Sequence, residues 1–105
     1  MKLKGMTHVG NVGVDSGQVM IVDPCYLDGY DPQTNEEWDL EKNKDKFSYQ
    51  GICHKTLTDK VGQVGLAVAS SSGYGDGYYP VYAEFDENER VVRLVIDFMG
   101  EDEEY

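Results

Sequence analysis

The clearest alternation of apolar and polar residues lies near the carboxyl end of the chain. Two runs with a period of two flank a polar turn at residues 86–89. This period places every second side chain on one face of a strand, so the runs predict an antiparallel hairpin with a buried apolar face. Its apolar positions are Tyr79, Val81, Ala83 and Phe85, then Val92, Leu94, Ile96 and Phe98.

A second hairpin is predicted near the amino end. Residues 7–15 space three valines among glycine and asparagine, and the sequence DSG at 15–17 has the composition of a turn. The apolar residues 19–22 then predict a strand. Asp23 and Pro24 end it, because proline has no backbone N–H to donate.

After Gly51, apolar and polar residues again alternate with a period of two. Residues 52–58 are predicted to form a strand and residues 59–62 a turn. In the strand after that turn, aliphatic and small residues are expected on opposite faces, and the small face would permit close approach of another layer. The aliphatic face is Val64, Leu66 and Val68, and the small face is Gly65, Ala67 and Ala69.

Residues 28–50 form a polar, charged segment of a different kind. Thr34 precedes Glu37 by the spacing of a helix capping box, which predicts a short helix over residues 35–44. Two interpretations stay open. The segment is either a lid or excursion held by Trp38, or an ordinary surface loop with one anchoring aromatic.

Six strands and one helical excursion predict an all-β, mainly antiparallel fold. Hairpins of this length must pair two apolar faces, which favours a compact sandwich or a partly open barrel. The length of 105 residues fits a single domain, 1–105, with an acidic tail at 100–105 expected to fray.

The chain is strongly acidic, with 20 carboxylates against 9 Lys and Arg and a formal net charge of -11. This charge repels phosphate backbones and anionic membranes, so direct binding to nucleic acid or membrane is disfavoured. An acidic surface is usually a solvated face that confers solubility. The alternative is docking on a basic partner, of which imitation of DNA would be an extreme form.

The amino-terminal sequence MKLKGMTHVG has two lysines without an apolar run behind them, unlike a signal peptide or membrane anchor. We therefore expect a cytoplasmic protein. There Cys25 and Cys53 are expected to be reduced thiols, because their spacing fits neither a zinc site nor a CxxC redox motif. No metal or cofactor is predicted.

The stretch SSSGYGDGYYPVY, residues 70–82, has the composition of a ligand-binding loop. Glycine permits positive φ, serine offers hydrogen bonds, and tyrosine offers a flat face with a polar tip. The alternative is a tight connection with tyrosines packed on the sheet. With Asp23, which could instead cap a turn, the predicted ligand-binding residues are Asp23, Ser72, Gly75, Asp76, Gly77, Tyr79 and Tyr82.

Two stretches, DSGQVMIVDPCYL and SSSGYGDGYYPVYAEFDENERVVRLVIDF, resemble small bacterial and phage proteins of a domain-of-unknown-function family. The resemblance implies that its two motifs meet in one site, and it implies a phage or mobile-element origin. The matching positions are Ser16, Gly17, Asp23 and Pro24, then Gly75, Asp76, Gly77, Tyr79, Pro80, Val81, Tyr82, Asp97 and Phe98.

Three functions follow as hypotheses. The first is a non-enzymatic binding module that sequesters a small polar or nucleotide-like ligand through the glycine-rich loop. The second is an acidic interaction factor that blocks a basic protein partner. The third is a small hydrolase using Asp23, Cys25 or His54, although Cys25 has no activating neighbour in the sequence.

Overall fold

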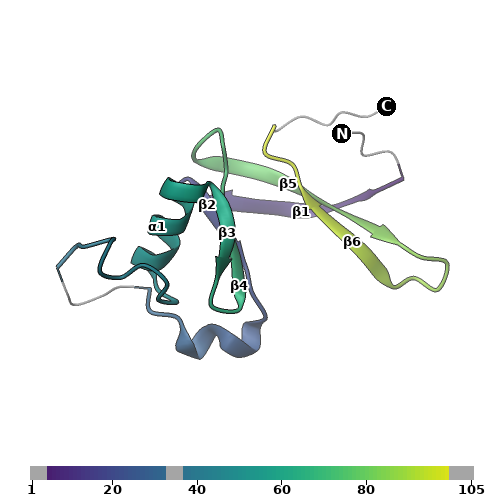
Figure 1. The fold of residues 1–105 in the computed structure, drawn as a ribbon. Helices are drawn as coiled ribbons and strands as arrows, with labels where there is room; N and C mark the ends of the chain where they lie inside the picture. Colours follow the sequence, from purple (N-terminus) through teal and green to yellow (C-terminus); the bar gives the residue numbers. More distant parts are fainter. Residues whose placement is uncertain (1–4, 33–36, 100–105) are drawn as a thin grey trace. The chain divides into compact units, whose positions relative to one another are not determined.

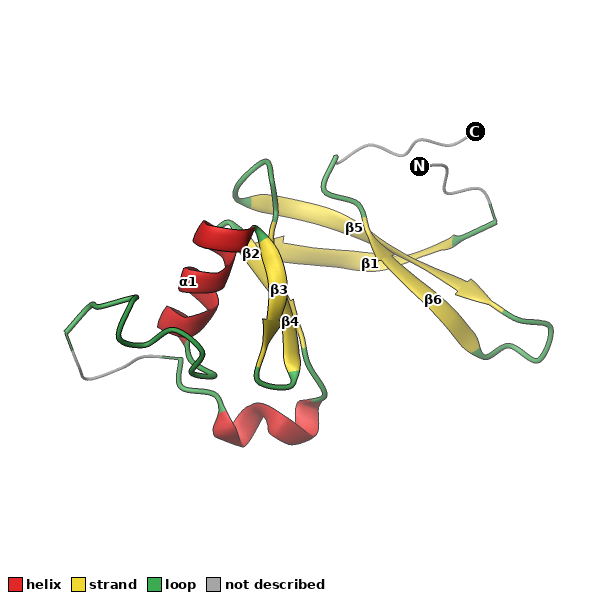
Figure 2. Cartoon of the chain, in the orientation of Figure 1, coloured by secondary structure: helices red, strands yellow, loops and turns green. Residues whose placement is uncertain are grey.

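The described part of the chain, residues 5–32 and 37–99 of the computed structural model, contains six strands and one α-helix (Figures 1 and 2). The strands pair in two three-stranded sheets, and every pair is antiparallel. One sheet has the order β1 (Thr7–Val14), β5 (Gly77–Phe85), β6 (Val91–Ile96), and the other has the order β2 (Gln18–Ile21), β4 (Ala67–Ser71), β3 (Val61–Val64), while the helix α1 spans Tyr49–Asp59. The predicted fold class is thus confirmed, without a closed barrel among the described strands. Two compact units result: the β5 unit, within Met1–Gly17 and Gly73–Tyr105, and the α1 unit, Gln18–Ser72.

The β5 unit is built on its central strand. β5 (Gly77–Phe85) pairs with β1 (Thr7–Val14) on one side and with β6 (Val91–Ile96) on the other. The predicted carboxyl-terminal hairpin is therefore confirmed, and β1 occupies the strand predicted over residues 7–15. The hairpin predicted near the amino end is wrong, because β1 pairs with β5, whereas the strand that follows it, Gln18–Ile21, pairs with Ala67–Ser71 in the other sheet. The acidic tail predicted at residues 100–105 lies outside the described residues.

The turn between β5 and β6 is held by one carboxylate. Asp86 Oδ1 accepts hydrogen bonds from the backbone N–H groups of Asn88, at 2.8 Å, and Arg90, at 2.9 Å, while Oδ2 accepts from Arg90 Nε at 3.1 Å. The backbone bond from Arg90, followed by those from Asn88 and the Arg90 side chain, lowers the pKa of Asp86. A carboxylate stabilised in its charged form thus fixes the direction in which β6 leaves the turn.

The predicted burial of the β6 face that carries Leu94 is wrong. The Leu94 side chain is 54% exposed, whereas Ile96 is half-buried. The reason is strand order: β6 lies at the edge of its sheet, and the buried residues of this hairpin lie on the central strand β5, at Tyr79, Tyr82 and Ala83.

We expect Leu94→Ala to lower the free energy of unfolding by less than about 1 kcal/mol, because much of its side chain already contacts water. Tyr79→Ala, at a buried position of the same sheet, should cost about 3 to 5 kcal/mol. Urea denaturation followed by circular dichroism measures both values. Equal and large losses for the two variants would contradict the observed exposure of Leu94.

The α1 unit packs one helix on a small sheet. Its strands are β2 (Gln18–Ile21), β3 (Val61–Val64) and β4 (Ala67–Ser71), and its helices are the 3-10 helix η1 (Pro24–Gly29) and the α-helix α1 (Tyr49–Asp59). Among the described residues, no helix has the length and apolar character needed to cross a membrane. The core cluster is Ile52, Val64 and Ala69, with Met20 and Tyr30 packed against it.

The strand predicted over residues 52–58 is wrong, because this segment belongs to α1. Ser48 begins the helix as N-cap, and its hydroxyl oxygen accepts a hydrogen bond from the Gly51 N–H at 3.0 Å. The β-branched threonines suit a helix here because their hydroxyls have partners. Thr58 donates to the His54 carbonyl at 2.7 Å, and Thr56 donates to Gln18 Oε1 at 2.5 Å.

The helix predicted over residues 35–44 is not found in its described part. Residues 37–39 have no regular structure and residues 40–45 form turns, while Thr34 of the predicted capping box lies outside the described residues. The polar groups of this segment pair with α1 instead: the Asp39 N–H donates to Gln50 Oε1 at 2.8 Å. Trp38 remains 62% exposed, with its ring 6.3 Å from that of Tyr49.

The predicted aliphatic face of residues 64–68 is also wrong. β3 ends at Val64 and β4 begins at Ala67, so a tight turn at Gly65 and Leu66 interrupts the alternation. Gly65 has a φ of 60°, which glycine adopts without strain. The small residues Ala67 and Ala69 are buried, whereas Leu66 and Val68 are exposed.

The two cysteines are free thiols in different surroundings. Cys25 is exposed in η1, whereas Cys53 is buried in α1, where its sulfur accepts a hydrogen bond from Gln18 Nε2 at 3.3 Å. We expect one thiol per chain to react rapidly with Ellman's reagent in the native protein, and the second only after unfolding in urea. Cys25→Ser should remove the rapid phase, and equal native rates for both thiols would contradict the burial of Cys53.

Candidate functional site

The glycine-rich segment between β4 and β5 is a loop with a defined backbone. Gly75 has a φ of 93° and Gly77 a φ of 154°, values that residues with a side chain rarely adopt. The Tyr79 hydroxyl donates to the Gly75 carbonyl at 2.8 Å. The two glycines therefore allow a turn that one side chain of β5 then closes.

Asp76 connects this loop to the loop that follows β1. Its Oδ1 accepts a hydrogen bond from the Gly17 N–H at 2.9 Å. Gly17 is 59 residues away in the sequence but belongs to the same β5 unit. Because Asp76 is exposed, one hydrogen bond leaves its carboxylate with further lone pairs for another donor.

The two tyrosines that the sequence proposed for ligand binding are both buried. Tyr79 is 6% exposed, and its ring meets that of Phe98 edge to face at 5.4 Å. Tyr82 is 8% exposed, and its ring lies 5.5 Å from that of His8. Both side chains thus pack within the β5 unit, and Tyr79 also holds the loop through its hydrogen bond to Gly75.

Two neighbouring tyrosines that sequence reasoning did not select are the exposed ones. Tyr74 is 72% exposed and Tyr78 is 81% exposed, with Asp76 midway between them in the sequence. Tyr78 lies opposite Gly13 of β1, where a Cβ would stand 3.4 Å from the tyrosine ring. Parity along the strand could not have found them, because Tyr74 precedes β5, and Tyr82, which has the same parity as Tyr78, is buried.

Asp23 and Ser72 belong to the α1 unit rather than to the β5 unit. Asp23 caps η1, and its Oδ1 accepts a hydrogen bond from the Cys25 N–H at 2.9 Å. This is the turn-capping role considered as an alternative for Asp23. Ser72 is completely buried at the end of the α1 unit. The other five predicted residues, Gly75, Asp76, Gly77, Tyr79 and Tyr82, lie together in the β5 unit.

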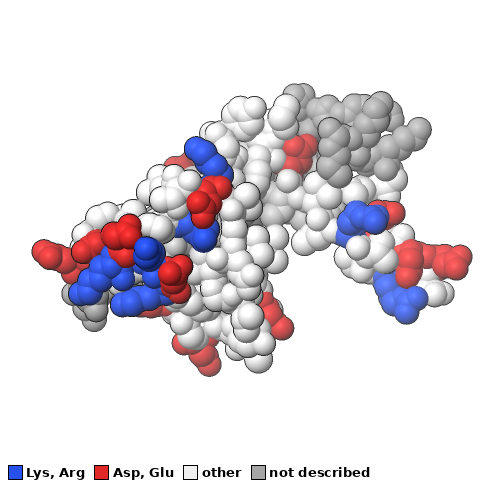
Figure 3. All heavy atoms as spheres, viewed as in Figure 1, with Lys and Arg blue, Asp and Glu red and all other residues white. Residues whose placement is uncertain are grey.

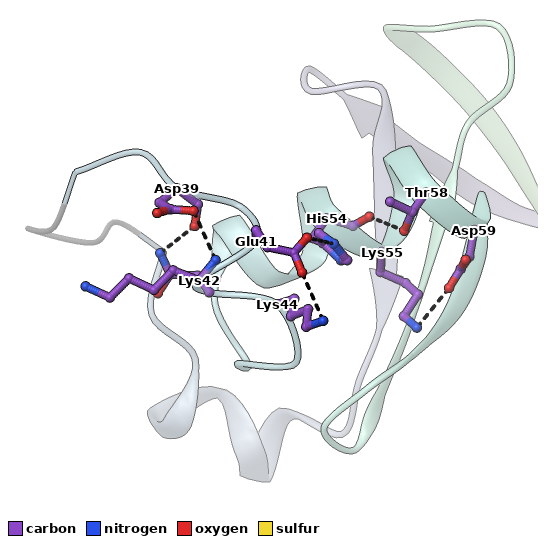
Figure 4. Close-up of polar contacts among 9 residues, drawn as sticks. Asp39, Glu41, Lys42, Lys44, His54, Lys55, Thr58 and Asp59 are labelled. Carbon is purple, nitrogen blue, oxygen red and sulfur yellow. Dashed lines mark hydrogen bonds and ion pairs between the residues drawn. The ribbon is translucent and has the colours of Figure 1, made fainter.

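The residues proposed for a hydrolase have other partners in the α1 unit. Figure 4 shows Glu41 between the side chains of His54 and Lys44: Oε1 lies 3.5 Å from His54 Nε2, and Oε2 lies 3.0 Å from Lys44 Nζ. The hydrogen bond and charge of Lys44 lower the pKa of Glu41. The close-up also shows the separate ion pair between Lys55 and Asp59, one helical turn apart on α1 at 3.1 Å.

The contacts of Glu41 with Lys44 and His54 are interactions at the protein surface. Glu41 is largely exposed, and His54 and Cys53 are neighbours on a helix, with Cys53 buried toward Gln18. Within residues 5–32 and 37–99, no group of three or more His, Cys, Asp or Glu side chains is placed to hold a metal ion. In the glycine-rich loop and at the start of β5, three exposed side chains, Tyr74, Asp76 and Tyr78, lie within five residues, and Asp76 is held by the Gly17 N–H.

Comparison with known proteins gives one match. The family model described as "Protein of unknown function (DUF4241)" matches residues 7–96, which include every strand and helix of the structure. The searches of curated proteins and of solved structures found no match. The resemblance to a domain-of-unknown-function family is thereby supported across both units.

Proposed function

The chain belongs to the DUF4241 family, and we propose that it is a non-enzymatic binding protein that captures a small polar ligand on the loop carrying Tyr74, Asp76 and Tyr78. The observation that supports this proposal is the combination of exposed aromatic side chains with a backbone held by internal hydrogen bonds. Tyr74 and Tyr78 extend into solvent, while Asp76 and Tyr79 bond to Gly17 and Gly75.

A fixed loop suits binding because little conformational entropy is lost when a ligand arrives. Tyrosine adds a large contact area with few rotatable bonds, which is why tyrosine, serine and glycine dominate the binding loops of antibodies. The loop here has the same composition. Of the buried tyrosines, Tyr79 holds the loop at Gly75, and the exposed Tyr74 and Tyr78 are available to the ligand.

The chemistry of the three side chains indicates the kind of ligand. Two phenol rings offer flat faces for stacking, and the carboxylate between them accepts hydrogen bonds from N–H or O–H groups. A nucleobase with its ribose supplies a flat ring and such donors. The net charge of -11 opposes phosphate groups, so we expect a nucleoside to bind better than its triphosphate. Sequestration of such a ligand fits the resemblance of the motifs to small bacterial and phage proteins.

The test is a titration of the full chain with adenosine, cytidine, guanosine and uridine, followed by nuclear magnetic resonance of the backbone amides. Shifts should centre on residues 73–78 for at least one nucleoside. Tyr74→Ala and Tyr78→Ala should each weaken binding by about tenfold, because stacking on an aromatic ring contributes about 1 to 3 kcal/mol per base. Asp76→Asn keeps an oxygen for the Gly17 N–H and isolates the effect of the charge.

Tyr26→Ala is the matched control, because Tyr26 is an exposed tyrosine of the α1 unit. It should leave both affinity and melting temperature unchanged. The proposal is wrong if no nucleoside shifts the loop at millimolar concentration, or if Tyr26→Ala weakens binding as much as Tyr74→Ala. It is also wrong if the loop variants lose affinity only in proportion to their loss of folded protein.

A further inference from the structure

One edge of the β5 unit is open along β6. This strand pairs with β5 on one side, and among residues 5–32 and 37–99 no strand pairs with its other side. The register with β5 shifts between Glu84 and Phe85 and is regular from Arg93 to Ile96. Alternate backbone N–H and C=O groups of this regular stretch therefore point outward, as in any edge strand.

The side chains of β6 do not protect this edge in the usual way. Edge strands commonly carry free lysines or a proline that prevent pairing with another chain. The only charged residue of β6 is Arg93, and its guanidinium is bound to Glu84 of the neighbouring strand. Val91, Val92 and Leu94 are exposed, so the strand presents an apolar surface next to unpaired backbone groups.

Carboxylates lie on both sides of this apolar strand. Glu87 and Glu89 are exposed in the turn before it, and Asp97 follows it directly. Figure 3 shows acidic and basic side chains gathered at that turn, where Arg90 is bound to Asp86. In the sequence, residues 101–104 add four further acidic positions after the strand.

We propose that the open edge of β6 is a docking site for an extended basic segment of a partner protein, which adds to the β1-β5-β6 sheet as a further strand. Backbone hydrogen bonds to residues 93–96 provide the pairing, and apolar side chains of the segment contact Leu94 and its neighbours. Lysine or arginine at both ends of the segment meets the carboxylates before and after β6. A second copy of this chain would bring like charges together, so charge complementarity favours the basic partner.

Docking at the edge of β6 does not require a ligand at the loop of Tyr74, Asp76 and Tyr78, so each of the two proposals can fail without the other. The hydrogen bonds of Asp86 fix the turn before β6, and the strand is therefore presented in one conformation.

The test uses a short fluorescent peptide in which valine and threonine alternate between lysines at both ends. Binding to the full chain is followed by fluorescence anisotropy at low and at physiological salt. A second peptide has the same sequence with alternate backbone nitrogens methylated, so that it keeps every charge but cannot pair as a strand. We expect methylation to weaken binding by at least about tenfold, because several hydrogen bonds are lost together.

Two charge variants locate the site. Glu87→Gln with Glu89→Gln should weaken binding of the lysine peptide several-fold, whereas Asp28→Asn with Glu37→Gln removes the same charge from exposed positions of the α1 unit and should have little effect. Leu94→Lys should abolish binding without loss of the folded state.

Other results would overturn the proposal. Equal binding of the methylated and parent peptides would mean attraction by charge alone. Equal losses in the two double variants would mean that the edge of β6 is not the site. A dimer of this chain that Leu94→Lys dissociates, with no binding of the peptide, would assign the edge to a second copy.

Discussion

Gly51→Ala is expected to lower the free energy of unfolding by more than about 3 kcal/mol, the largest effect of any glycine substitution in the described chain. A Cβ at this position would lie 1.9 Å from the Lys46 carbonyl oxygen and 3.2 Å from that of Asn43. Both atoms belong to the backbone, so the loop before α1 would have to move. Gly51 also donates the N-cap bond to Ser48, which the same movement would break.

A loss of stability here would be informative, because replacing glycine by alanine in a helix normally stabilises the helix by about 1 kcal/mol. Gly62→Ala is the matched control. Its Cβ would meet the flexible Lys55 side chain at 2.9 Å, which can move aside, and we expect a change within about 1 kcal/mol. Urea denaturation followed by circular dichroism measures both variants, and a Gly51→Ala protein as stable as the parent would contradict the close approach.

Gln50→Leu is expected to cost about 3 kcal/mol, because it removes a buried acceptor that two N–H groups share, one of them on the buried Asn43 side chain. Gln50 is 1% exposed, and its Oε1 accepts hydrogen bonds from the Asp39 N–H at 2.8 Å and from Asn43 Nδ2 at 3.0 Å. Leucine has a similar volume but leaves both donors without this partner. Asn43 Nδ2 would keep only its bond to the Asp39 carbonyl at 3.0 Å, and one of its buried N–H groups would lose its acceptor.

The same substitution at an exposed site is the control for Gln50. Gln63→Leu removes a hydrogen bond from Nε2 to the Gly65 carbonyl at 2.9 Å, and water can replace it. We expect a change below about 0.5 kcal/mol. The double variant Asn43→Leu with Gln50→Leu should cost less than the sum of its single variants, because it removes a donor together with its acceptor. Strict additivity would show that the two side chains do not act as a pair.

The sequence predicted best the strands in which apolar and polar residues alternate and which pair with their neighbour in the sequence through a short turn. The runs on either side of Asp86 are long, regular and joined by a short turn, so pattern and structure agree there. Residues 52–58 carry the same alternation of apolar and polar positions, but Ser48 caps a helix there, and Gln50 on its first turn binds the loop before it. The partners of Gln50 lie in a segment without apolar periodicity, and hydrophobic pattern alone cannot reveal them.

Burial was harder to predict than strand position. Leu94 occupies an apolar position in an alternating run, as a core residue would, yet it is exposed because its strand lies at the edge of the sheet. The order of strands in a sheet cannot be deduced from the alternation of apolar and polar residues. In the glycine-rich loop, composition indicated an unusual segment but not which of its tyrosines are exposed. Tyr79 and Tyr82 have opposite parity on β5 and are both buried, so their exposure depends on tertiary packing, which alternation along the chain does not reveal.

The way in which the chain enters and leaves the α1 unit has a consequence for the order of folding. Residues 18–72 separate β1 from β5, so those two strands must close a long loop before they pair. Within the α1 unit, Gln18 pairs with Ser71, which brings the two ends of that loop together. We therefore expect β4 to gain hydrogen-exchange protection before β5 in a pulse-labelling experiment, and simultaneous protection would contradict this order.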